Sequence, residues 1–87
     1  MSDTSPLKFP LEFPVKIMGR DTQVFHDAVA VIFAEHVAPI ENLKVARQSS
    51  SAGRFISVTV TFTAESREQL DALYRALTAS EHVLMTL

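Results

Sequence analysis

The sequence predicts an α+β fold in which a four-stranded antiparallel sheet carries two helices on one face. Residues 55–64 alternate without interruption between apolar and polar side chains, which is typical of a strand with one buried face. Two other stretches place apolar residues three and four positions apart, the spacing of an amphipathic helix. With three shorter alternating segments, the elements follow one another as strand, helix, strand, strand, helix, strand.

Composition limits the classes of function. The 87 residues are 47% apolar, which is enough for one domain with a modest core. Eight Lys and Arg against ten Asp and Glu give a net charge of −2, which argues against a nucleic-acid partner. The absence of cysteine removes disulfides and thiolate sites. Since no secretory signal and no apolar run of ~20 residues is present, we expect a cytoplasmic protein without a membrane partner.

Residues 1–11 are predicted to form a flexible N-terminal arm, and residues 12–87 a single domain. The arm contains two prolines, which lack a backbone N–H and restrict the residues before them. Part of the arm is expected to lie against the domain through Leu7 and Phe9.

The first strand is predicted over residues 13–19, and Gly19 allows the chain to bend there. A helix follows Asp21 or Thr22, both suitable N-cap residues, and Pro39 prevents its continuation. The inward residues of the strand are Phe13, Val15 and Ile17. The apolar stripe of the helix comprises Phe25, Ala28, Val29, Ile32, Phe33 and His36.

The second half of the chain repeats this plan after a hairpin. A strand over residues 43–48 turns at residues 49–53, which are small and typical of a hairpin tip, into the central strand. Ser66 followed by Gln69 is a capping-box signature for the second helix. That helix presents Leu70, Leu73, Tyr74 and Leu77. The central strand buries Ile56, Val58, Val60 and Phe62, and the last strand, over residues 82–87, is predicted to bury Val83, Met85 and Leu87.

Right-handed crossovers then give a ferredoxin-like βαββαβ arrangement whose second sheet face stays open. The predicted members of this open face are Lys16, Met18, Lys44, Ala46, Gln48, Ser57, Thr59, Thr61, Leu84 and Thr86. Of these, the candidate interaction residues are Lys16, Met18, Ser57 and Thr59.

Several short motifs resemble those of the YbeD family of small bacterial proteins. They are Phe9-Pro10, Phe13, Lys16, Met18-Gly19, Ser50-Ser51, Gly53, Phe55, Ser57-Val58, Met85 and Leu87, and they span nearly the whole chain beyond the arm. The resemblance implies a domain similar to ACT-type regulatory domains, which bind amino acids or other small effectors at subunit interfaces. The resemblance also suggests a regulatory connection with lipoate metabolism. It implies no catalytic residues for this chain.

No reaction chemistry stands out among the polar residues. His26 and His36 leave different faces of one helix, and neither they nor His82 have ligand partners at metal-binding spacing. The serines at 49–51 lack a nucleophile-elbow pattern, and a hairpin tip explains them. A solvated helix face explains the carboxylates of Glu65, Glu68 and Asp71. We therefore predict that the protein is not an enzyme and uses no metal or cofactor.

The junction of Gly19, Arg20 and Asp21 is the candidate effector site. The first strand ends and the first helix begins there, so free backbone donors, aided by Arg20, can receive a carboxylate or phosphate. In ACT-like domains, effectors commonly lie at this junction. A tight turn capped by Asp21 is the alternative, which we favour because such caps are routine and Asp21 would repel an anion.

The leading hypothesis is a non-enzymatic regulatory or adaptor domain that associates with itself or with a partner enzyme, through sheet edges or the open face. It includes a small-molecule effector. The alternative is an RNA-binding module, since RNA-recognition motifs share the same element order. Such a module needs two aromatic residues two positions apart on the third strand, and Ser57 stands where the partner of Phe55 belongs.

Overall fold

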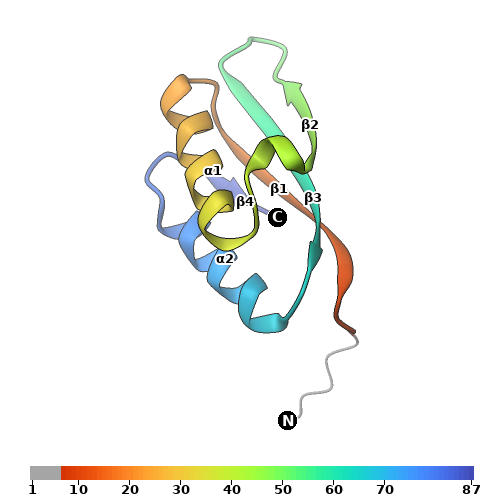
Figure 1. Cartoon of the computed structure of the whole chain (residues 1–87). Helices are drawn as coiled ribbons and strands as arrows, with labels where there is room; N and C mark the ends of the chain where they lie inside the picture. The colour runs from red at the N-terminus through yellow and green to blue at the C-terminus, as the bar shows by residue number, and fades with distance from the viewer. Residues whose placement is uncertain (1–6) are drawn as a thin grey trace.

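The computed structural model describes residues 7–87 and has the predicted ferredoxin-like architecture (Figure 1). The sheet is antiparallel, in the order β2-β3-β1-β4. Its elements are β1 (Leu11–Arg20), α1 (Gln23–His36), the 3-10 turn η1 (Ile40–Asn42), β2 (Lys44–Ser49), β3 (Phe55–Ala64), α2 (Arg67–Ala79) and β4 (Met85–Thr86). Within the described residues, no helix is long and apolar enough to span a membrane.

β1 and β3 pair along their whole length at the centre of the sheet. The register runs from Leu11 opposite Ala64 to Arg20 opposite Phe55. Every second residue of β3 from Ile56 to Ala64 is buried, so the predicted facing of this strand is confirmed. The alternating pattern therefore separates a core face from an open face along both central strands.

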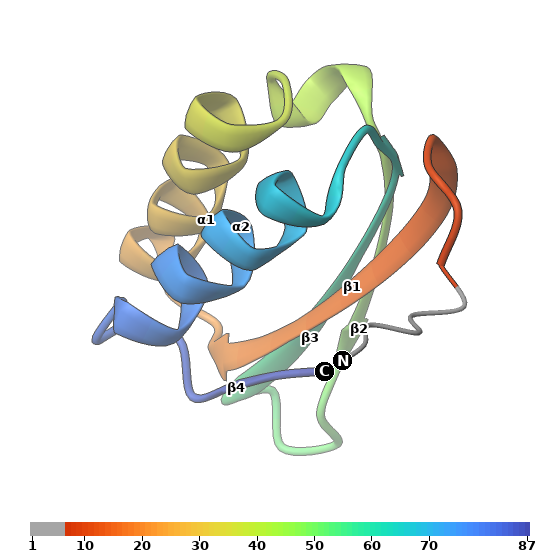
Figure 2. The same cartoon turned by 90° about the horizontal axis from the view of Figure 1, so that it is seen from below.

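Both helices cover the core face of the sheet (Figure 2). α1 begins after Thr22, whose Oγ1 accepts a hydrogen bond from the backbone N–H of Phe25 at 3.2 Å. It buries Phe25, Val29 and Phe33, and the Phe33 ring meets the Phe62 ring of β3 edge-on at 6.0 Å. Aromatic packing thus joins the first helix to the central strand.

The predicted cap of α2 also joins the two helices. Ser66 Oγ accepts a hydrogen bond from the Gln69 N–H at 3.1 Å, as a capping box requires. The Gln69 side-chain oxygen accepts from the N–H of Glu65 at 2.7 Å, one residue earlier than in a standard box. Its amide nitrogen donates to the His36 carbonyl at 2.9 Å, so one side chain holds the end of α1 against the start of α2.

The predicted facing of the last strand is wrong. β4 comprises only Met85–Thr86, and Thr86 pairs with buried Ile17 while Met85 pairs with Met18 on the open face. Met85 and Leu87 are accordingly exposed, at 51% and 61%, and Thr86 faces inward. The alternation fails because residues 81–84 form a turn and an irregular segment, so Val83 packs on the core from outside the strand.

β1 begins at Leu11, two residues before the predicted start, and so includes the last residue assigned to the flexible arm. Phe9 packs against the core as expected. Residues 1–6, where the rest of the predicted arm falls, lie outside the described residues.

The facing of β3 predicts a severe effect for Val60→Asp. Val60 is 0% exposed in a core to which both helices contribute, so the variant would bury an unpaired carboxylate. We expect it to lose more than about 4 kcal/mol of unfolding free energy, measured by chemical denaturation. Thr59→Asp is the matched control, because Thr59 lies on the open face opposite Lys16. Similar stability of the two variants would contradict the facing.

Tyr74 makes stability sensitive to alkaline pH. It donates a hydrogen bond to the main-chain oxygen of Leu87 at 3.2 Å and meets the Phe13 ring edge-on at 6.4 Å. Burial raises the pKa of its hydroxyl above the ordinary 10.0. The unfolded chain therefore ionises first, so stability is unaffected below pH 10.0 and is lost as the pH rises through the raised pKa.

Alkaline titration of the phenolate absorbance band measures this directly, because the chain has one tyrosine and no tryptophan. We expect a midpoint above 10.0 in the folded protein. Tyr74→Phe should remove the signal and flatten the loss of stability in the same pH range. A midpoint at or below the ordinary value would contradict this account.

Candidate functional site

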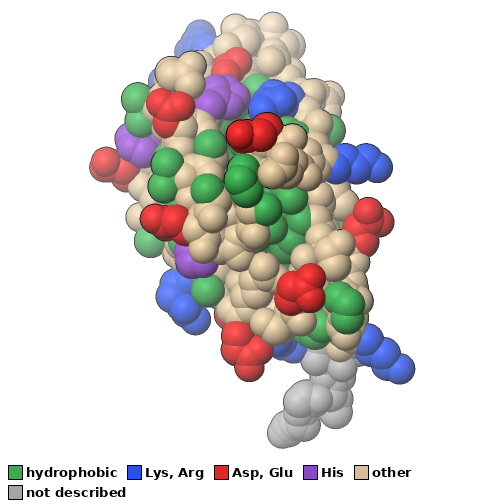
Figure 3. All heavy atoms as spheres, viewed as in Figure 1, with side chains coloured by type: hydrophobic (Ala, Val, Ile, Leu, Met, Phe, Trp, Pro, Cys, Tyr) green, Lys and Arg blue, Asp and Glu red, His purple; other side chains and the backbone are tan. Residues whose placement is uncertain are grey.

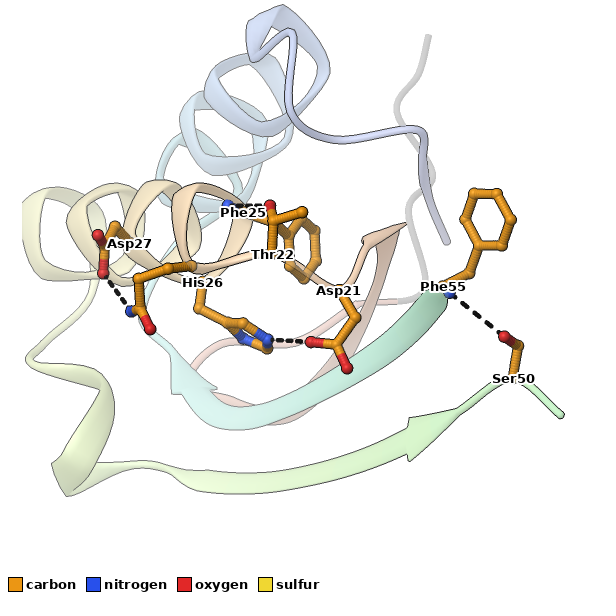
Figure 4. Close-up of polar contacts among 8 residues, drawn as sticks. Asp21, Thr22, Phe25, His26, Asp27, Ser50 and Phe55 are labelled. Atoms are coloured by element: carbon orange, nitrogen blue, oxygen red, sulfur yellow. Dashed lines mark hydrogen bonds and ion pairs between the residues drawn. The ribbon is translucent and has the colours of Figure 1, made fainter. Parts of the chain in front are cut away.

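On the helix side of the predicted effector junction, the polar groups of Asp21 already have partners within the protein. Asp21 Oδ1 lies 2.8 Å from His26 Nε2 (Figure 4). The Asp21 N–H donates to the Arg54 carbonyl at 2.8 Å. Thr22, not Asp21, caps α1. The carboxylate of Asp21 is thus directed toward α1 and already has a partner.

Gly19 is required by packing at this junction. It is buried, and a Cβ atom at this position would overlap the Phe25 ring and lie 2.8 Å from the His82 carbonyl oxygen. Only a residue without a side chain lets β1, α1 and the segment before β4 approach so closely. This contact brings Leu84 and Met85 beside the end of β1, since the Leu84 N–H donates to the Met18 carbonyl at 2.8 Å.

Arg20 points to the open face, away from Asp21. Its guanidinium carbon lies 5.7 Å from the centroid of the Phe55 ring, a cation–π contact between paired residues of β1 and β3. The three residues of the predicted effector site therefore diverge. Asp21 belongs to the helix start, while Arg20 belongs to the open sheet face.

A hollow of about 420 Å³ lies on the open face next to this cation–π pair. One row of paired residues crosses all four strands there, namely Gln48, Ser57, Met18 and Met85. The complete lining is Met18, Gly19, Gln48, Ser49, Ser50, Phe55, Ile56, Ser57, Leu84 and Met85. The predicted candidates Met18, Gly19 and Ser57 thus meet at one place, and Lys16 and Thr59 face each other in the adjacent row.

Large apolar side chains surround the hollow and are accessible to solvent. Phe55 is 41% exposed, Leu84 62% and Met85 51%. Exposed apolar residues that gather around a concavity are typical of binding surfaces. Met85 was missed as a site residue because its strand was predicted with the opposite facing. Only the register of β4 against β1 reveals its position.

The polar residues considered for chemistry have structural partners or lie apart. Ser50 Oγ accepts a hydrogen bond from the Phe55 N–H at 3.2 Å within the hairpin turn. His82 Nε2 lies 3.7 Å from a carboxylate oxygen of Glu81, and His26 contacts Asp21. Within residues 7–87, no group of three His, Cys, Asp or Glu side chains is arranged to hold a metal ion.

A second hollow, of about 430 Å³, lies along the outer side of α1. It is lined by Val24, Asp27, Ala28, Val31, Ile32 and His82. Val24 and Val31 are 53% and 56% exposed, and carboxylate and histidine side chains are distributed over this side of the molecule (Figure 3). The helix side therefore combines apolar exposure with acidic charge.

Fold and surface together define a small ferredoxin-like α+β domain whose open sheet face carries an apolar hollow. The chain belongs to the family described as "Protein of unknown function (DUF493)", whose model matches residues 4–87. The resemblance to the YbeD family is thereby confirmed, since YbeD belongs to this same family.

Relatives named UPF0250 proteins match nearly the whole chain. A UPF0250 protein from Chromobacterium violaceum is 40% identical over 80 residues, which cover 92% of this chain and 90% of the relative. A UPF0250 protein from Nitrosomonas europaea is 36% identical and covers 100% of this chain and 98% of its own. The solution structure of protein HP0495 from H. pylori superposes with a TM-score of 0.63 at 12% identity, covering 99% and 90% of the two chains, which shows a common fold.

We expect substitution by alanine to cost more stability at Gly19 than at Gly53. Gly19→Ala adds a methyl group that overlaps Phe25, and we expect it to cost at least about 2 kcal/mol of unfolding free energy. Gly53 has φ 74° in the hairpin turn with open space around it, so Gly53→Ala should cost only about 1 kcal/mol. Denaturant unfolding of both variants measures the difference. A smaller loss at Gly19 than at Gly53 would refute the packing role.

Proposed function

We propose that this protein is a non-enzymatic regulatory or adaptor domain that binds a small effector or a partner enzyme at the open sheet face. The observation that carries the proposal is the hollow of about 420 Å³, with exposed Phe55, Leu84 and Met85 around it. A soluble ligand or protein side chain that fills it would bury these apolar surfaces, which is favourable by about 25 cal/mol per Å².

The residues around the hollow also favour an occupant with a polar end. Ser57 and Gln48 offer hydroxyl and amide groups on its floor, and Arg20 lies over Phe55 at its margin. An apolar body against Phe55 and Met85 would leave a carboxylate within the field of Arg20. This moves the proposed effector position from the turn at Asp21 to the sheet side of the same junction, where Gly19 still lines it.

Calorimetric titration with amino acids, lipoate and octanoate tests the effector role. We expect one of these carboxylates to bind the wild type with measurable heat and to raise its melting temperature. Met85→Asp should weaken this binding at least about tenfold, because it places a charge against the apolar body. Val31→Asp is the matched control, since Val31 is similarly exposed on α1.

Absence of heat and thermal shift with all three compound classes would count against a small effector. Affinity capture from the native cell followed by mass spectrometry then tests the partner enzyme. A partner retained by Val31→Asp and lost by Met85→Asp would place the interface on the open face. Loss of the partner in both variants, or in neither, would contradict that placement.

RNA binding is the second candidate, because Phe55 is exposed on the open face with Arg20 stacked over it. Ser57 still occupies the place of the second stacking residue, which is why this reading stays second. A salt-dependent mobility shift of single-stranded RNA that Phe55→Ala abolishes would promote it above the first proposal.

A further inference from the structure

β2 forms a free edge of the sheet. It pairs with β3 on one side, and no other described strand pairs with it. All of its residues are exposed except Val45, which is half-buried. The opposite edge, β4, is only two residues long, so β2 is the edge that offers a continuous length of backbone.

Alternate backbone groups of β2 point away from the sheet. The Ser50 N–H donates to the Phe55 carbonyl at 2.8 Å, which identifies this pair as hydrogen-bonded. Such pairs recur every second residue in an antiparallel ladder, so the even-numbered residues of β2 bond to β3. The N–H and C=O groups of Val45, Arg47 and Ser49 therefore point outward, where an added strand can bind them.

Positive charge is concentrated on the sheet, although the chain carries a net charge of −2. The acids of the described residues lie mostly on the helices and their loops, and Glu12 is the acid on β1, β2 and β3. Lys44 and Arg47 have no carboxylate partner within residues 7–87, where the ion pairs are those of His26 and His82. The cations of β1, β2, β3 and the connecting turn are Lys16, Arg20, Lys44, Arg47 and Arg54.

These edge cations determine which kind of strand fits. If two copies paired symmetrically along β2, the Lys44 and Arg47 side chains of both copies would share one seam and repel. An acidic strand is attracted on both faces of the sheet instead. Lys44 lies on the open face beside Thr61, while Arg47 lies on the other face beside Val58. Val45 shares the face of Arg47 and offers an apolar contact.

We propose that the free edge of β2 receives an extended acidic segment of a partner protein as a fifth, antiparallel strand. Its carboxylates lie opposite Lys44 and Arg47, and an apolar side chain lies opposite Val45. Read along the segment, this gives the pattern acid, any residue, apolar, acid. The inference deepens the adaptor role and rests on it for the binding of a protein partner. It uses the outward backbone of β2, which adjoins the hollow at Gln48 and Ser49.

A capped peptide, Thr-Glu-Thr-Val-Glu-Thr, titrated to millimolar concentration into the full chain tests the proposal by NMR. We expect slower amide hydrogen exchange at the outward N–H groups of Val45, Arg47 and Ser49. Binding should weaken as salt is added. The same peptide with Lys in place of both Glu should bind at least about tenfold more weakly, because it repels the edge cations.

Two substitutions of Arg47 separate the contribution of its charge to peptide binding from the contribution of its backbone N–H. Arg47→Gln removes the guanidinium and keeps the outward N–H, so binding should weaken about threefold. Arg47→Pro also removes that N–H, which β3 does not use, and should weaken binding at least about tenfold while the native spectrum is kept. Arg75→Gln removes an exposed cation on α2, outside the sheet, and is the matched control that should bind as the wild type does.

The proposal would be overturned by equal binding of the acidic and basic peptides, by an equal loss of binding in Arg75→Gln, or by unchanged amide exchange along β2. Slow amide exchange along β2 before peptide is added, together with a doubled molecular mass in sedimentation, would show that a second copy of the chain occupies the edge. That result would also overturn the proposal. If Arg47→Pro does not fold, Lys44→Gln takes its place. Peptide should protect the β2 amides of this variant less than those of the wild type, and equal protection would overturn the proposal. Carboxylate binding at the hollow is measured separately, so failure at the edge and failure of the effector role are distinguishable.

Discussion

The antiparallel pairing of β1 with β3 is the constraint on which the rest of the structure depends. The two strands are matched from Leu11 opposite Ala64 to Arg20 opposite Phe55, so one register assigns every side chain of both to a face. Val15, Ile17, Val58 and Val60 are buried beneath the helices as a consequence. A slip of one residue would exchange them for polar neighbours, and burial of each apolar side chain is worth about 1.5–3 kcal/mol.

Contacts at the two ends of the helices fix the helices against each other and against the paired strands. At one end, Gln69 bonds to Glu65 and to His36, which aligns the helices with each other. At the other end, Gly19 lets Phe25 and the backbone of His82 close over β1. The second contact brings Met85 beside Met18, and the hollow on the open face exists because of it.

Net charge is a poor guide to the electrostatics of this molecule. The net charge of −2 is the sum of an acidic helix side and a basic sheet. The sheet strands carry Lys16, Arg20, Lys44 and Arg47, and Glu12 is their one acid. Because charges at a surface act mainly within about 10 Å at moderate salt, a ligand at the open face or at the β2 edge experiences the local cations. The charge distribution therefore makes the sheet the more positive side of the molecule, and only the fold reveals it.

Local patterns were sufficient for most of the architecture. β3 has the predicted bounds because its alternation is uninterrupted, and Ser66 caps α2 because its hydroxyl reaches the N–H three residues on. The motifs between Phe9 and Leu87 identified the family for the same reason, since each is recognised from its position along the chain without knowledge of the fold. Met85 shows the limit: its facing depends on where β4 docks against Met18, a contact between residues far apart in sequence. The hollow and the outward groups of β2 likewise arise from pairing across strands, which local alternation does not encode.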